Sequence, residues 1–109
     1  MVRLSVRLVA RPGQARSLAA ALRQLLAEAR TARACVGHQL STDLSDSDTL
    51  HYAEDWFTET DFRSQIGTPR FQRLIGIMEA AAEPPRFEVQ IISRSYGLDY
   101  VAAVLRDGS

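Results

Sequence analysis

The fold of this chain is restricted most by the order in which two hydrophobic periodicities, one typical of strands and one typical of helices, occur along the sequence. Alternating apolar and polar residues predict a strand with one buried face, whereas apolar residues three or four positions apart predict an amphipathic helix. The chain begins with an alternation whose apolar members are Val2, Leu4, Val6 and Leu8. Pro12 and Gly13 interrupt this strand. The helical spacing that follows involves Leu18, Leu22, Leu25, Leu26 and Ala29.

The middle of the chain predicts a hairpin of two strands. One alternating run extends from Cys35 to Leu44 and stops in the turn-forming residues 43–48. The returning strand covers Thr49 to Phe57. One of its faces carries Leu50, Tyr52, Glu54 and Trp56, and the other carries His51, Ala53, Asp55 and Phe57. At most one of these two faces can lie under the helices.

Two helical segments, a fourth strand and a last helix follow. Thr58 can cap a short helix that Gly67 interrupts, and Thr68 and Pro69 are suited to start the next one. The inner stripe of that second helix is Phe71, Leu74, Ile75 and Met78, and Pro84-Pro85 ends it. The fourth strand places Phe87, Val89 and Ile91 on one face. After Gly97 a short C-terminal helix carries Leu98, Val101 and Leu105.

This order, β-α-β-β-α-β plus a helix, predicts an α+β fold of the ferredoxin-like class. Its four strands form an antiparallel sheet with both main helices on one face. A chain of 109 residues supports one core, so residues 1–109 are expected to form a single domain. The second sheet face would include Val9, Ile92 and one side of the third strand, which favours pairing of two copies through that face.

Composition excludes several classes of function. The 13 basic and 13 acidic side chains give a formal net charge of zero, which does not favour nucleic acid or an anionic membrane as partner. Cys35 is the single cysteine, so neither an internal disulfide nor a multi-cysteine metal site is possible. We find no His, Asp and Glu spacing typical of metal ligands, no signal segment and no membrane span, and we expect a cytoplasmic protein.

The sequence contains the stretches "YAEDWFTETDFRSQIGTPRFQRLI" at residues 52–75 and "EPPRFEVQII" at residues 83–92. These two stretches resemble the antibiotic biosynthesis monooxygenase family. The recurring features are an acid two positions before Trp56, the apolar Phe62 six positions after it, and the helix start at Pro69 and Phe71. The resemblance implies a homodimer in which two ferredoxin-like domains form a dimeric α+β barrel. It also implies oxidation of an aromatic polyketide-type or quinol-like molecule by O2 without a cofactor.

The chain departs from the family pattern at two helix positions. Gln65 and Arg70 stand where many members carry histidines, and the histidine that holds iron in the haem-degrading branch has no equivalent in residues 71–83. Haem degradation is therefore not favoured. An arginine binds oxyanions, but it does not act as a base at neutral pH.

We interpret Trp56, Arg70 and His38 as candidate catalytic residues. Trp56 can stack on an aromatic ring and His38 can accept a phenolic proton. The candidate substrate contacts are Tyr52, Glu54, Phe62, Gln65, Phe71 and Arg73. Structural explanations exist for the same residues: Trp56 as core, Glu54 as half of an ion pair, His38 in packing or an interface, and Arg73 on a solvated helix face.

Two functions therefore stay open at this stage. The first is a cofactor-independent monooxygenase, an oxidoreductase that binds a small aromatic substrate between its helices and sheet. The second is a non-catalytic dimeric barrel that binds a small ligand or serves as an association module. The sequence names neither the substrate nor the pathway.

Overall fold

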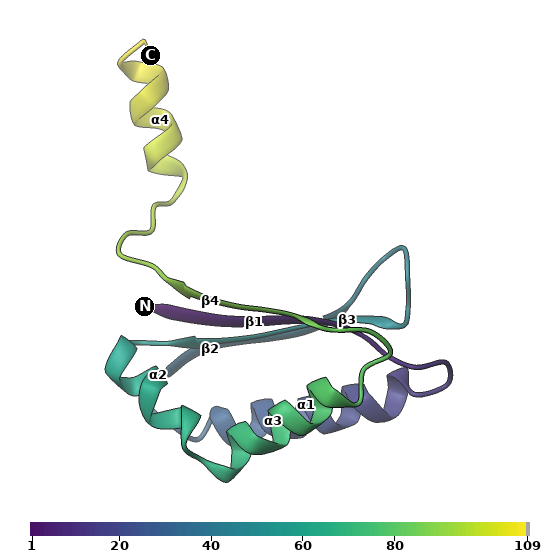
Figure 1. The fold of residues 1–109 in the computed structure, drawn as a ribbon. Coiled ribbons are helices and arrows are strands. Elements are labelled where there is room, and N and C mark those ends of the chain that lie inside the picture. Colours follow the sequence, from purple (N-terminus) through teal and green to yellow (C-terminus); the bar gives the residue numbers. More distant parts are fainter. Residues whose placement is uncertain (109) are drawn as a thin grey trace.

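The computed structural model describes residues 1–108 and confirms the predicted order of elements (Figure 1). The elements are β1 (Val2–Val9), α1 (Ala15–Ala29), β2 (Cys35–Thr42), β3 (Thr49–Trp56), α2 (Glu59–Ile66), α3 (Pro69–Glu79), β4 (Arg86–Ile91) and α4 (Leu98–Arg106). The strands form one antiparallel sheet in the order β2-β3-β1-β4. Helices α1, α2 and α3 cover one face of it, as a ferredoxin-like fold requires (Figure 1).

Side-chain caps determine where α2 and α3 begin. The Thr58 hydroxyl accepts a hydrogen bond from the Asp61 backbone N–H at 3.1 Å. The Thr68 hydroxyl accepts one from the Phe71 N–H at 3.2 Å, and Pro69 occupies the first helical position. Both caps were predicted from the sequence. They position the break at Gly67 so that α3 starts a new helix over the sheet.

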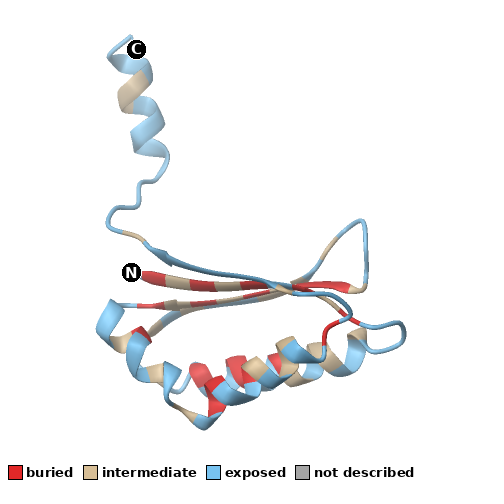
Figure 2. Cartoon of the chain, in the orientation of Figure 1, coloured by how far each residue is buried: buried red, intermediate tan, exposed pale blue. Residues whose placement is uncertain are grey.

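The core lies between the sheet and the three covering helices (Figure 2). Pairing of β1 with β3 places Val2 opposite Trp56, Leu4 opposite Glu54 and Val6 opposite Tyr52. All six side chains are buried. The inner face of β3 is therefore the side that carries Tyr52 and Trp56, a choice that the alternation alone had left open.

Strand β4 continues this inner face without being buried. Its Phe87, Val89 and Ile91 pair with Val6, Leu4 and Val2 of β1 and share their side of the sheet. Nevertheless all three are exposed, as the pale strand in Figure 2 shows. Helix α1 contacts β2 and β3 and helix α2 contacts β3, whereas an apolar groove lies between β4 and helices α2 and α3.

The outer face of the sheet is largely polar. Arg3, Ser5 and Arg7 lie there beside His51 and Asp55, with apolar Phe57 just beyond the end of β3. The apolar residues predicted for this face lie at the ends of its strands. Pairing of two copies through this face stays a prediction.

Helix α4 stands apart from the rest of the chain. It rises on the side of the sheet opposite α1, α2 and α3 (Figure 1). The radius of gyration is 16.4 Å, whereas a compact domain of this length has about 13 Å. Within residues 1–108, no helix has the length and apolar character that crossing a membrane requires.

Candidate functional site

A buried polar cluster joins the middle of the sheet to helix α3. Tyr52, Glu54 and Trp56 occupy alternate positions of β3 and therefore point to the same face. Arg70 lies in the first turn of α3, directly after Pro69, and its side chain extends from the helix to Glu54. The side chain of Glu54 is 1% exposed and Trp56 is fully buried, while 8% of Arg70 remains exposed. The structure thus brings together four residues that the sequence had singled out.

The Glu54 carboxylate is the centre of this cluster. Arg70 binds it through two nitrogens, with Nη1 donating to Oε2 at 2.6 Å and Nη2 donating to Oε1 at 3.0 Å. The Trp56 indole N–H donates to Oε1 at 3.0 Å, and the Tyr52 hydroxyl donates to Oε2. Each carboxylate oxygen therefore accepts two hydrogen bonds. A carboxylate whose two oxygens are occupied by four donors is well suited to tie β3 to α3.

The ionisation of the cluster follows from burial and from the pairing. Burial raises the pKa of Tyr52 far above its ordinary value, and the charge of Glu54 and its hydrogen bond raise it further. For Arg70, burial alone would lower the pKa, but the hydrogen bond and charge of Glu54 outweigh it, and the pKa is raised. At neutral pH Tyr52 is a neutral donor and Arg70 is a cation. Neither group can take a proton from a phenol.

Arg70 makes further contacts on the side away from Glu54. Its Nη2 donates to Gln65 Oε1 at 3.4 Å, and its Nη1 donates to the Leu25 carbonyl at 3.5 Å. The guanidinium carbon lies 5.8 Å from the centre of the Trp56 ring, within reach of a cation–π interaction. Gln65 and Arg70, the two positions without the family histidines, are therefore hydrogen-bonded to each other.

An apolar groove of about 320 Å³ opens between helices α2 and α3 and strand β4. Two predicted substrate contacts, Phe62 and Phe71, belong both to this groove and to the buried core. Phe71 directly follows Arg70 in α3, but no residue of the buried cluster lines the groove. The lining consists only of apolar side chains: Phe62, Ile66, Phe71, Ile75, Met78, Phe87 and Val89.

Two further predicted site residues lie elsewhere. His38 is on the inner side of β2, in a separate hollow of about 680 Å³ beside α1 that Leu26, Arg30 and Leu40 also line. Arg73 lies on the surface of α3 and pairs with Glu28 of α1, with its Nη2 2.6 Å from Oε2. The structure does not bring His38 or Arg73 together with the buried cluster.

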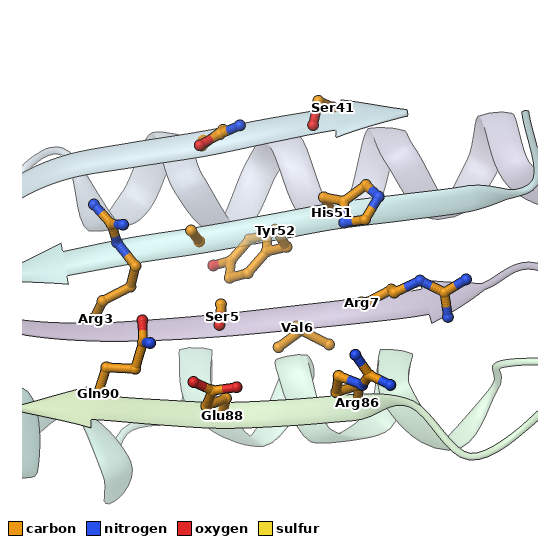
Figure 3. A pocket seen from close by; sticks show the side chains of 12 residues that line it. Arg3, Ser5, Val6, Arg7, Ser41, His51, Tyr52, Arg86, Glu88 and Gln90 are labelled. Carbon is orange, nitrogen blue, oxygen red and sulfur yellow. The ribbon is translucent and has the colours of Figure 1, made fainter. Parts of the chain in front are cut away.

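The outer face of the sheet carries a second, polar hollow of about 580 Å³ (Figure 3). Arg3 forms an ion pair with Asp55 at 2.7 Å, and His51 lies 3.5 Å from Asp43. Arg7 and Arg86 occupy directly paired positions of β1 and β4. The sequence does not indicate these two arginines as a pair, because their proximity depends on the order of strands in the sheet. This hollow is larger than the apolar groove, and most of the residues that line it are polar or charged.

Comparison with known proteins identifies the family of the chain. The model for antibiotic biosynthesis monooxygenases matches residues 1–76. The chain belongs to this family. Those residues include β1, the whole buried cluster and most of α3. No curated protein matches the sequence.

Solved structures of similar shape include other members of the antibiotic biosynthesis monooxygenase family. A putative antibiotic biosynthesis monooxygenase from Deinococcus radiodurans superposes with a TM-score of 0.79 at 17% identity, over 89% of this chain and 97% of its own. A Mycobacterium tuberculosis protein gives 0.76 at 18% identity, over 88% and 98%. A Pseudomonas aeruginosa protein gives 0.71 at 25% identity, over 85% and 94%. The two relatives below 25% identity support the fold alone.

Proposed function

We propose that this protein is a homodimeric monooxygenase that oxidises a phenolic or quinol-like aromatic molecule with O2 and needs no cofactor. The observation that carries the proposal is the apolar groove, whose lining includes Phe71, the residue that follows Arg70 in α3. An aromatic ring can lie against Phe62 and Phe71 in this groove. Membership of the monooxygenase family supports the reaction class.

The proposed reaction requires few functional groups from the protein. A phenolate delivers electrons to O2, one oxygen atom enters the ring to give a quinone, and the other leaves as water together with the two displaced hydrogens. The overall reaction therefore needs no external reductant. The phenolic proton is released to water at the open side of the groove. The buried cluster of Arg70, Glu54, Tyr52 and Trp56 ties β3 to α3 and so holds Phe71 of the groove in position.

A second function, binding of an apolar ligand without catalysis, is favoured by a different observation. Among the described residues that line the groove, none has a side chain that titrates. The two histidines lie on other surfaces, His38 beside α1 and His51 on the outer face. A protein with this groove can bind an apolar ligand without oxidising it.

Oxygen uptake with a panel of anthrols, naphthols and hydroquinones separates the two functions. We expect uptake above the rate without protein, with one atom of ¹⁸O2 appearing in the quinone by mass spectrometry. Ile75→Phe, which narrows the groove, should lower the rate at least several-fold, whereas the surface variant Arg73→Gln should not change it. Binding of the same compounds without uptake would support the second function. Failure of both would refute the proposed site.

A further inference from the structure

Helix α4 carries an apolar stripe that no other part of the described chain covers. Leu98 is 81% exposed and Leu105 is 74% exposed, and Val101 lies between them on the same side of the helix. Asp99 and Arg106 share a neighbouring, polar side of the helix at helical spacing. A single helix of nine residues is marginal in water, because its hydrogen bonds barely offset the cost of nucleation. The amphipathic pattern therefore indicates a helix that is stabilised by packing.

The same chain has an uncovered apolar surface of matching character. It consists of the groove between α2, α3 and β4 together with the exposed inner side of β4. Phe87 and Val89 line the groove, and Ile91 extends the surface toward the end of the strand. We call this the β4 surface. One more helix, lying beside α3, would complete the helical layer over the sheet.

The stripe and the β4 surface do not meet within one copy of the chain. The β4 surface faces the side of α1, α2 and α3, whereas α4 rises on the other side of the sheet (Figures 1 and 2). Two such copies related by a twofold axis can satisfy both surfaces at once, because each copy supplies one helix and one β4 surface. The position of α4 away from the rest of its chain accounts for the large radius of gyration.

We propose that α4 of each copy packs its apolar stripe on the β4 surface of a second copy and so supplies the missing wall of the apolar groove. The proposal rests on the homodimer of the proposed function and is independent of the oxidation chemistry. The family match ends at residue 76, so α4 lies outside the region that defines the family. The helix is thus a feature of this chain that the family match does not imply.

Single substitutions on either surface should weaken the dimer. Leu105→Glu places a charge in the stripe, and Phe87→Glu places one on the β4 surface. For each we expect the dimer dissociation constant to rise by roughly tenfold or more, since a buried charge without a partner is costly. The matched control Arg106→Gln, on the polar side of α4, should change it less than about threefold. Light scattering across a dilution series measures these constants.

Mixing the two variants tests whether the contact is made between copies. In a mixed dimer, the intact α4 of the Phe87→Glu chain meets the intact β4 surface of the Leu105→Glu chain, so one of the two contacts is restored. We expect mixed dimers to exceed the half of all dimers that random pairing gives, as counted by native mass spectrometry. Should α4 instead fold back on its own chain, mixing would restore nothing, and random or lower pairing would overturn the proposal.

Two further outcomes also decide the question. A wild-type chain that is monomeric at micromolar concentration would overturn the proposal, and so would a dimer unaffected by Leu105→Glu. If Phe87→Glu fails to fold by circular dichroism, Ile66→Glu replaces it, because Ile66 lines the same groove and is 44% exposed. Absence of oxygen uptake alongside preferred mixed dimers would refute the proposed reaction and leave this contact standing.

Discussion

The inner faces of β3 and β4 carry the same alternating pattern and lie on the same side of one sheet, but they are buried to very different degrees. On β3 even the charged Glu54 is buried, whereas on β4 the hydrophobic Val89 is 42% exposed. Helices α1 and α2 contact β3, and the apolar groove separates α3 from β4. Burial in this fold therefore depends on which strand a helix covers, and residue type alone does not predict it.

The largest expected effect comes from breaking the buried pair on the β3 side. Arg70→Met leaves the Glu54 carboxylate buried without its cation, and we expect a loss of about 3–5 kcal/mol in the free energy of unfolding. Arg73→Met, on the same helix but in a surface pair with Glu28, should cost less than about 1 kcal/mol. Urea unfolding measures both. The double variant Glu54→Leu/Arg70→Met should recover part of the loss, and equal losses for the two single arginine variants would contradict this account.

A smaller effect is expected from Tyr52, and it depends on pH. Tyr52→Phe removes one donor to Glu54 and should cost about 1.5–3 kcal/mol at neutral pH. The pKa of Tyr52 is raised in the folded chain, so its contribution is complete below the unfolded value of about 10 and is lost as pH rises above it. The free energy of unfolding of the wild type should therefore fall more steeply above about pH 10 than that of Tyr52→Phe. Parallel curves would show that Tyr52 does not contribute in this way.

The smallest effect is expected on the β4 side. Val89→Ala should cost less than about 1 kcal/mol when unfolding is measured below the dissociation constant of the dimer, because Val89 is already partly exposed there. Leu4→Ala is the matched comparison, since Leu4 pairs with Val89 on the same face and is fully buried. It should cost about 2–5 kcal/mol. A similar loss for both variants would mean that β4 is covered within a single chain.

The candidate site was only partly predictable from the sequence. Alternation placed Tyr52, Glu54 and Trp56 on one face, and the start of α3 at Thr68 and Pro69 placed Arg70 near them, because both depend on local spacing. The saturation of Glu54 by four donors could not be predicted, since it requires the distance from β3 to α3.

The positions of His38 and of the two arginines on the outer face, Arg7 and Arg86, could not be predicted for the same reason. His38 shares the inner side of the sheet with Glu54, but α1 and β2 form a separate hollow around it. Arg7 and Arg86 are far apart in the sequence and meet because β1 pairs with β4. Contacts of this kind depend on strand order and helix placement, which a hydrophobic period does not encode.

The sequence by itself determined the elements, their caps, the two faces of each strand and the resemblance to the family, because each depends on residues a few positions apart. Only the tertiary structure decided which face of β3 was buried, that Glu54 binds Arg70, and that β4 and α4 are left uncovered. These outcomes depend on which strands of the sheet each helix covers. Helix α1 contacts β2 and β3, α2 contacts β3, and a groove lies between α3 and β4, so the apolar residues of β4 and α4 stay exposed within residues 1–108.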